Sequence, residues 1–397
     1  MMRDSNVTVA TNPNRRALPS VYETIGEQAD LLSSHLQSMS EAFPLTSQKI
    51  LRKFTSGEAA RLMNVSDSTL RKMSLVGEGP QPETTSNGRR LYTLPDINQI
   101  RHLLAQSTRG RGSIEFAPHR RPGGHLQVLA VTNFKGGSGK TTTSAHLVQY
   151  QALQGYRVPA VDLEPQASLS ALLGVLPELD VASNQTLYAA IRYDRNRRGL
   201  SDVIRPTYFD GLDLVLGNFE LMEFEHTTPK ALSTGAGGET LFFTRVTEAL
   251  DEVADNYGVM VIDGPPQLGF LTLSGLCAAT AMIVTVHPQM LDISSMSWFL
   301  LMIRDLLGVV RDAGSDLKCH FIRYLLTRFE PQDAPQTKVA RLHPHGKEKG
   351  AETDPGSPSQ LVTAKRTTLL GIHVKSLWHR FGERFSVAFR KVDENAD

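Results

Sequence analysis

The chain has little cysteine: its 397 residues include only Cys277 and Cys319. Two thiols cannot form a disulfide scaffold or a four-cysteine metal site. Both lie in apolar stretches, so we expect buried free thiols in a reducing cytoplasm. No apolar run approaches the roughly 18 residues of a membrane span, and the polar first residues lack the apolar core of a secretory signal. We therefore expect no membrane span and no export.

Net charge is also small, because 42 Lys and Arg balance 41 Asp and Glu to leave +1. The distribution is uneven: residues 1–127 have 16 basic and 11 acidic side chains (net +5), residues 128–340 have 16 and 23 (net −7), and residues 341–397 have 10 and 7 (net +3). A basic front joined to an acidic middle is typical of a nucleic-acid-binding module fused to an enzyme. Chance asymmetry of a solvated surface is the alternative. The length itself favours two or three domains.

Residues 1–45 combine a polar start, which we expect to be disordered, with one amphipathic helix. Val21, Ile25, Leu32, Leu36 and Met39 recur at helical spacing and form one apolar stripe. That stripe must be buried somewhere. It packs either on its own chain or on a second copy of it, and the sequence leaves both possibilities open.

Residues 46–106 have the pattern of a small DNA-binding module. Thr55 and Glu58 form a capping box that opens one helix, and Ser66 caps a second. The Asn87-Gly88 pair predicts a hairpin with positive φ at both positions. A third helix follows Thr93. The order helix, turn, helix, wing, helix is similar to the winged helix-turn-helix of MerR-type proteins, with the second helix in the major groove.

Five side chains are candidates for DNA contact in this module. Three lie on the second helix and two at the tip of the wing, where arginine suits phosphates or the minor groove. They are Ser68, Arg71, Lys72, Arg89 and Arg90. An ordinary solvated basic face is the alternative. Residues 107–127 are rich in Gly, Arg and Pro, as expected of a linker.

A phosphate-binding loop follows the short apolar stretch 128–132 and precedes a helix predicted over 143–153. Glycines let backbone N–H groups turn inward, Lys140 suits the outer phosphates, and the Thr141 hydroxyl suits Mg²⁺. The residues that we expect to contact nucleotide are Lys135, Gly136, Gly137, Ser138, Gly139, Lys140, Thr141 and Thr142. A chance glycine-rich turn is a poor alternative in this strand–loop–helix context.

The early lysine makes the loop resemble the deviant Walker A motif of the ParA/MinD group of ATPases. That resemblance implies ATP and Mg²⁺ as cofactors and a nucleotide-sandwich homodimer in which Lys135 reaches the partner's phosphates. It also implies a catalytic acid pair, matched here by Asp162 and by Glu164, where the group usually has Asp. Asp263, after the apolar stretch 259–262, matches the Walker B position and would hold Mg²⁺ with Thr141. The longer side chain of Glu164 would slow hydrolysis or alter its geometry.

Alternating strands and helices between residues 128 and 340 predict a doubly wound α/β domain with a mostly parallel sheet, a P-loop NTPase fold. Strands are expected at 157–164, 212–216, 259–263, 281–286 and 320–327, and helices at 239–256 and 296–310. Nucleotide should lie outside the carboxyl ends of the strands.

Residues 20–340 look closest to the RepA group of partition ATPases from repABC plasmids, notably over 162–194, 286–296 and 324–340. The resemblance implies plasmid segregation with a centromere-binding ParB/RepB-type partner, repression of the chain's own operon, and binding to non-specific nucleoid DNA. Residues 341–397 depart from that group. They are either a frameshifted or replaced end, or a divergent folded one.

Two rival functions use parts of the same pattern. A transcription repressor gated by ATP, without segregation activity, needs the same module and loop. An electron-transfer or biosynthetic relative is a second rival. A nitrogenase-type iron protein needs cysteines near the Walker B segment, and Cys277 is the first cysteine of this chain. A cobyrinate amidotransferase has no need of residues 52–106. The twelve histidines show no metal-binding spacing.

Overall fold

The computed structural model describes residues 20–42, 49–108, 116–118, 125–235, 241–314, 319–330, 332–341 and 359–365. The predicted disordered start, most of the predicted linker and most of the atypical tail lie outside these residues. The chain divides into two units, residues 1–48 and residues 49–397.

The first unit contains the predicted amphipathic helix, α1 (Val21–Ala42). Ser20 caps it, since its hydroxyl accepts from the Glu23 N–H at 3.2 Å and the Glu23 carboxylate accepts from the Ser20 N–H at 2.8 Å. Its apolar stripe is exposed, with Ile25 at 61%, Leu32 at 62% and Leu36 at 58%. Nothing within the described residues of this unit covers that stripe.

The second unit begins with the winged module. Its elements are β1 (Phe54–Thr55), α3 (Ser56–Met63), α4 (Asp67–Val76), β2 (Glu83–Thr84), β3 (Arg90–Tyr92) and α5 (Leu94–Ser107). The predicted caps at Thr55, Ser66 and Thr93 are all present. The three short strands form one antiparallel sheet in the order β1-β3-β2.

The wing turn differs from the expected two-residue turn. Thr85 and Arg89 are joined by a backbone hydrogen bond of 2.9 Å, so Ser86, Asn87 and Gly88 form the loop. Among the described non-glycine residues with positive φ, Asn87 does not occur, whereas Gly88 has φ 72°. The geometry fits a three-residue hairpin loop that ends in a left-handed glycine, and the prediction of positive φ at both positions was wrong.

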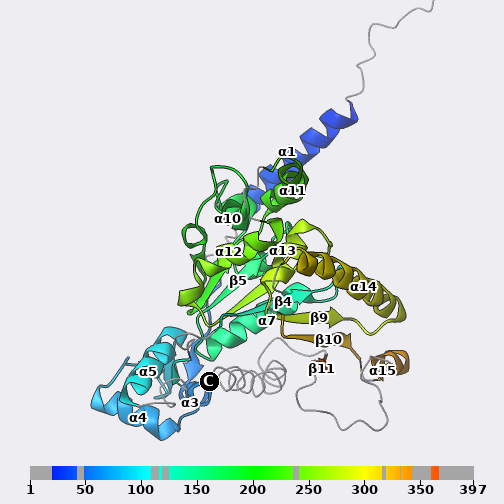
Figure 1. The fold of residues 1–397 in the computed structure, drawn as a ribbon. Coiled ribbons are helices and arrows are strands. Elements are labelled where there is room, and N and C mark those ends of the chain that lie inside the picture. The colour runs from blue at the N-terminus through cyan, green and yellow to red at the C-terminus, as the bar shows by residue number, and fades with distance from the viewer. Residues whose placement is uncertain are drawn as a thin grey trace, which may run out of the picture. The chain divides into compact units, whose positions relative to one another are not determined.

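A sheet of eight described strands follows, in the order β11-β10-β9-β4-β8-β5-β7-β6 (Figure 1). Every pairing among them is parallel except the edge pair β6–β7. The strands are β4 (Gln127–Thr132), β5 (Val158–Asp162), β6 (Arg205–Pro206), β7 (Leu212–Val215), β8 (Val259–Asp263), β9 (Ala281–Val286), β10 (Phe321–Phe329) and β11 (Ser359–Lys365). The predicted doubly wound parallel sheet is confirmed.

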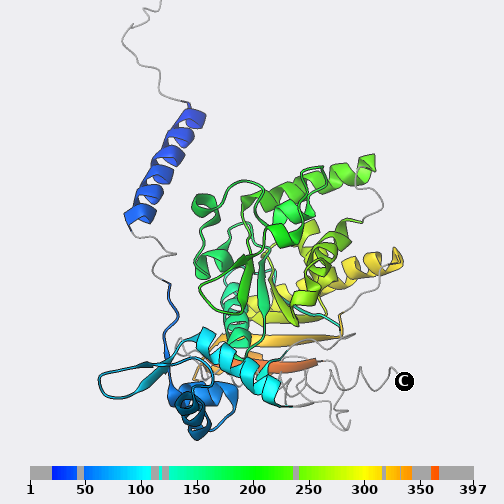
Figure 2. The same ribbon diagram turned by 90° about the vertical axis from the view of Figure 1, so that its left-hand side faces the viewer.

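Helices cover both faces of this sheet (Figure 2). On one face, α7 (Lys140–Leu153) and α8 (Ser168–Leu172) share an apolar core with the winged module. The other face is covered by five helices: α10 (Leu187–Ile191), α11 (Met222–Thr234), α12 (Arg245–Asp251), α13 (Phe270–Ala278) and α14 (Met290–Asp312). The remaining helical segments are α9 (Pro177–Asp180), η1 (Leu200–Asp202), η2 (Phe219–Leu221), η3 (Phe242–Thr244), η4 (Ala254–Asn256) and α15 (Ala334–Arg341).

Two helices differ from the predictions. The helix predicted over 239–256 is broken into η3, α12 and η4 within its described part. Helix α14 begins at Met290, not at 296. The sheet does not end at residue 340, because the backbone of β11 pairs in parallel with β10, from Ser359 beside Ile322. Strand β11 lies beyond residue 340 and is an edge strand of this sheet; the domain boundary at 340 stays a prediction.

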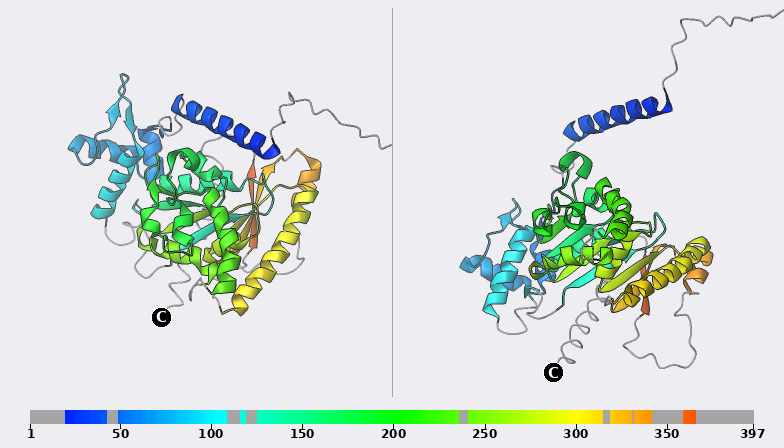
Figure 3. Two further views of the ribbon diagram at one scale, coloured as in Figure 1. Left: turned by 90° about the horizontal axis from the view of Figure 1, so that it is seen from above. Right: turned by 45° about the horizontal axis from the view of Figure 1, so that its top comes forward.

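Helix α14 also bears on the expected absence of a membrane span. Within the described residues it is the helix long and apolar enough to cross a membrane, by length and composition. Helix α14 lies along one side of the sheet (Figure 3). Its inner face, including Met296, Phe299 and Ile303, packs in the core beside β9, while Trp298 and Val309 are exposed. A helix that packs one apolar face in a core and carries further apolar residues on the other meets these criteria without any membrane.

Candidate nucleotide site and DNA-reading module

The predicted phosphate loop lies between β4 and α7, at the carboxyl end of the sheet. Gly137 and Gly139 have φ 72° and 87°, and helix α7 begins directly at Lys140. The Ser138 hydroxyl lies 2.9 Å from that of Thr285, and the Thr327 hydroxyl donates to the Ser138 carbonyl at 2.7 Å. The ends of β9 and β10 therefore hold the loop in shape.

Lys140 is buried at the base of this loop, with 6% of its surface exposed. Its Nζ donates to the Lys135 carbonyl at 3.2 Å. Burial lowers the pKa of the ammonium, while the negative charges of Asp263 and Glu164 oppose that shift. The three groups that the sequence assigned to phosphate and Mg²⁺ chemistry thus act on one another in the structure.

Asp162 and Asp263 end the neighbouring strands β5 and β8 and are paired in register. Both are fully buried. Burial raises the pKa of each carboxyl, and for Asp263 the adjacent charge of Asp162 is the next cause. Two buried acids side by side cannot both ionise without a large cost, so this pair favours a cation between or beside them.

The hydrogen bonds separate the roles of the two acids. Asp162 Oδ2 accepts from the Ser170 N–H and hydroxyl, both at 2.8 Å, and Oδ1 accepts from the Glu164 N–H at 3.1 Å. Asp162 therefore shapes the turn after β5. Asp263 Oδ1 accepts from the Ser144 hydroxyl at 2.8 Å, a contact that the sequence analysis missed.

Asp263 Oδ2 is the atom that points to a bound cation. It is buried without a hydrogen bond from the described residues, although the Thr141 hydroxyl lies near enough to this carboxyl to lower its pKa. An unpaired buried carboxylate oxygen is costly. The described residues include no cluster of three or more His, Cys, Asp or Glu that could hold a metal alone. One carboxylate, a nearby Thr141 hydroxyl and phosphate oxygens suit Mg²⁺, which is usually bound by few protein ligands.

Glu164, expected as the second catalytic acid, lies half-buried two residues after the end of β5. Its charge favours the protonated form of Lys140 and raises the pKa of Asp162 and Asp263. Its charge therefore acts on all three groups. Its role as the second catalytic acid stays a prediction.

Lys135 is held by a residue that the sequence did not single out. Its Nζ forms an ion pair with Asp292 in the first turn of α14, and His287 Nδ1 lies 3.2 Å from the other Asp292 oxygen. The Asp292 side chain is 5% exposed and that of Lys135 is 42% exposed. The early lysine is thus half-open to solvent and tied within its own protomer.

The DNA-contact candidates lie on the winged module, on α4 and at the wing. Ser68, Arg71 and Lys72 belong to α4, while Arg89 is exposed at the wing and Arg90 is half-buried. Arg71 Nη2 also lies 3.3 Å from Asp67 Oδ2, one turn earlier. The structure therefore groups the five residues on the recognition helix and the wing, as the sequence predicted; DNA contact itself stays a prediction.

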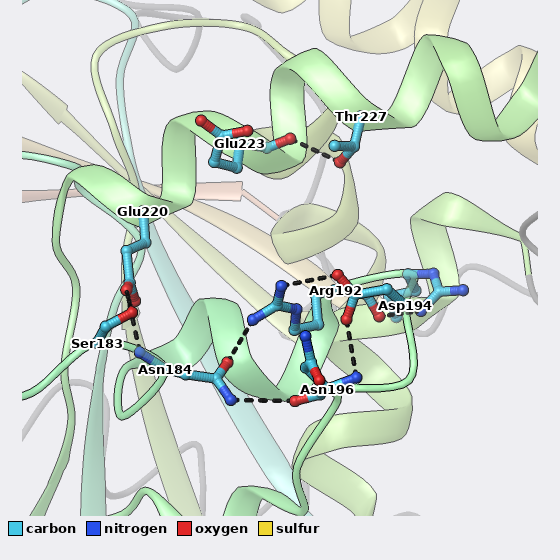
Figure 4. Close-up of polar contacts among 9 residues, drawn as sticks. Ser183, Asn184, Arg192, Asp194, Asn196, Glu220, Glu223 and Thr227 are labelled. Atoms are coloured by element: carbon cyan, nitrogen blue, oxygen red, sulfur yellow. Dashed lines mark hydrogen bonds and ion pairs between the residues drawn. The ribbon is translucent and has the colours of Figure 1, made fainter.

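Arg192 opens an arginine-rich stretch, 192–198, and forms contacts within its own domain. Arg192 Nη1 donates to Asn184 Oδ1 at 2.6 Å and Nη2 to Asp194 Oδ2 at 2.7 Å, and Asn184 Nδ2 donates to the Asn196 carbonyl at 3.1 Å (Figure 4). The Glu220 carboxylate holds the other end of this loop through the Asn184 N–H at 3.0 Å. Arg192 thus fixes a loop of the α/β domain.

Comparison with known proteins agrees with both parts of the chain. An AAA domain model matches residues 126–312, and a MerR family regulatory protein model matches residues 55–92. A replication protein A of Sinorhizobium fredii is 51% identical over 82% of this chain and 80% of its own length. SopA of Escherichia coli K12 is 32% identical over 73% of this chain and 72% of its own. A solved partition protein has the same fold, with TM-score 0.59 and 20% identity over 80% of this chain and 86% of that one.

These features define a P-loop protein with an ATP-binding fold and a MerR-like DNA-binding module. The chain belongs to the ParA family of partition ATPases. Over most of its length it is about half identical to a replication protein A.

Proposed function

We propose that the chain is an ATPase that segregates a plasmid together with a centromere-binding partner of ParB/RepB type and represses its own operon. The observation that carries the enzymatic part is the buried pair Asp162 and Asp263 beside Lys140 and the phosphate loop. The 51% identity to a replication protein A supports the plasmid setting. Such a protein would act in the cytoplasm, on the nucleoid.

ATP would bind at the N-terminus of α7, where free backbone N–H groups and the helix dipole favour phosphate. Lys140 would contact the outer phosphates. Thr141 and Asp263 would hold Mg²⁺, which neutralises charge on the transferred phosphoryl group. Asp162 would keep the turn after β5 in place, and Glu164 would help to orient the attacking water.

DNA binding would use two surfaces of different specificity. The recognition helix α4 and the wing would read the operator, with Arg89 and Arg90 on phosphates or the minor groove. Non-specific nucleoid DNA would be bound by the ATP form.

The exposed stripe of α1, with Leu32 at 62% and Met39 at 62%, suits pairing with a second copy.

ATP hydrolysis measured alone, with DNA, and with DNA plus the cognate centromere-binding protein tests this proposal. We expect a slow basal rate that rises when both are present. If neither DNA nor the centromere-binding protein changes the rate and operator binding is intact, the alternative of a transcription repressor gated by ATP remains. Lys140→Ala is the control, because hydrolysis that survives it cannot come from this phosphate loop.

A further inference from the structure

Lys49, the first residue of the second unit, contacts a short helix of the α/β domain. Its Nζ donates to the Ala171 carbonyl at 2.9 Å and to the Leu172 carbonyl at 2.7 Å. Leu172 is the last residue of α8. The last carbonyls of a helix have no partner within the helix and form its negative pole, so an ammonium group there is favourable. Lys49 therefore caps the C-terminal end of α8.

The Lys49 side chain lies close to the backbone at this helix end. Burial lowers the pKa of its ammonium group, because the charged form loses hydration. The two carbonyls replace part of that hydration as acceptors. Gly174, just after α8, has φ 98°, and a Cβ there would lie 3.3 Å from Lys49 Cδ. The backbone after α8 thus leaves room for the lysine stem.

Helix α8 also carries the residue that holds Asp162. Ser170 donates to Asp162 Oδ2 from both its N–H and its hydroxyl, at 2.8 Å each, and its hydroxyl accepts from the Gly217 N–H at 3.2 Å. Ser170 directly precedes Ala171, whose carbonyl accepts from Lys49. The helix has only five residues, too few to be stable without such contacts. Lys49 and Asp162 therefore both fix its position.

The turn between Asp162 and α8 contains a strained residue. Ala167 has φ 54°, in the left-handed region that is unfavourable for a residue with a Cβ. Its N–H donates to the Glu164 carbonyl at 2.9 Å, and the Glu164 N–H donates to Asp162 Oδ1 at 3.1 Å. Strained backbone persists only where its surroundings fix it. Residues 162–172, here called the acid turn, thus position Glu164, and Lys49 holds the far end of the acid turn.

We propose that Lys49 is a positioning residue for ATP hydrolysis, which holds α8 and, through the acid turn, keeps Glu164 where it would orient the attacking water. This inference rests on the proposed function, in its ATPase part. The contact of Lys49 does not involve the phosphate loop, so its loss should slow the chemical step and leave nucleotide binding intact. A displacement of about 1 Å at a catalytic group can cost about 100-fold in rate.

The test compares phosphate release by the full-length wild type and by Lys49→Met, which keeps an apolar stem and loses the ammonium group. We expect kcat to fall about 10- to 100-fold in Lys49→Met, with an unchanged Kd for a fluorescent ADP analogue. Lys49→Arg keeps a charged donor and should restore most of the rate.

Amide hydrogen exchange reports on the acid turn directly. The N–H groups of Glu164, Ala167 and Ser170 are all hydrogen-bonded within this turn. In peptides that cover it, exchange should be at least about tenfold faster in Lys49→Met than in wild type, as expected for the loss of a charged hydrogen bond. Lys49→Arg should exchange like wild type.

Lys53→Met is the matched control. Lys53 forms an ion pair with Glu83 inside the winged module, so its variant should keep the wild-type kcat and exchange. The inference is overturned by wild-type kcat or wild-type exchange in Lys49→Met, by an equal loss in Lys53→Met, or by a loss that Lys49→Arg does not restore. Weaker ADP binding in Lys49→Met also overturns it, because the damage is then not confined to the acid turn. Absence of hydrolysis in wild type overturns the proposed function together with the inference.

Discussion

Replacing Asp263 with Asn should stabilise the nucleotide-free protein while abolishing its hydrolysis of ATP. The Asp263 carboxylate is fully buried, its Oδ2 receives no hydrogen bond from the described residues, and Asp162 is its neighbour across β5 and β8. Asn keeps an oxygen for the Ser144 hydroxyl and places an N–H₂ group near Asp162. A buried polar group left unpaired costs about 1–3 kcal/mol. Wild type bears this cost when Asp263 is ionised, whereas the neutral amide of the Asp263→Asn variant does not.

The gain in stability of Asp263→Asn over wild type should depend on pH, in the direction set by the raised pKa of Asp263. Burial and then Asp162 raise the pKa of Asp263 above its ordinary value of 3.8. The folded state therefore binds a proton that the unfolded state has lost, and wild-type stability falls as pH rises from about 4 through the folded pKa. The variant lacks this loss. Its advantage in Tm should be smallest in acid and largest above neutrality, where 1–3 kcal/mol is about 2–12 °C.

Thermal unfolding of both proteins from pH 5.5 to 8.5 without nucleotide measures this difference. The exposed Asp251 supplies the control, since Asp251→Asn should shift Tm little at any pH. Adding Mg²⁺ and ATP should raise the Tm of wild type and narrow or reverse the gap. A variant less stable than wild type at pH 8, or an advantage that does not change with pH, would show that ionised Asp263 does not destabilise the folded state.

Three further predictions rest on single contacts. Leu32→Asp in α1, where Leu32 is 62% exposed, should shift the protein to monomer in analytical ultracentrifugation without changing its Tm; an unchanged dimer would contradict pairing through α1. Arg89→Ala at the wing should weaken operator binding and reduce the slope of log K against log salt by about 1, and a full slope would remove Arg89 from the phosphate contacts. Glu225 accepts from the N–H groups of Phe270 and Leu271 at 3.0 and 2.8 Å, so Glu225→Ala should cost about 0.5–2 kcal/mol in urea unfolding, and no loss would show that α13 has no need of this cap.

Local signals predicted the elements and the phosphate loop well. Strand–loop–helix order and the spacing of Lys135, Lys140 and Thr141 predicted the loop between β4 and α7, and capping residues such as Thr55 and Ser66 predicted the helices of the winged module. These features depend on neighbours in sequence, which a single chain shows directly.

The contacts that hold the site together could not be predicted, because they join residues far apart in sequence. Ser144 donates to Asp263, 119 positions away, and Arg101 donates to Leu153, 52 positions away. Arg101 lies on α5, and nothing in the sequence of that helix indicates that this arginine is buried. Asp292 was hidden for a related reason: α14 begins six residues earlier than its apolar period suggested, and only then does this acid reach Lys135.

In the proposed function, the phosphate loop hydrolyses ATP under the control of DNA and a centromere-binding partner. The most direct measurement is phosphate release by wild type and by Lys140→Ala, each alone and with DNA plus the cognate ParB/RepB-type protein. We expect a slow wild-type rate that increases with both additions and no hydrolysis in the variant. Equal rates for wild type and Lys140→Ala, or a wild-type rate that the partner and DNA leave unchanged, would contradict the proposed function.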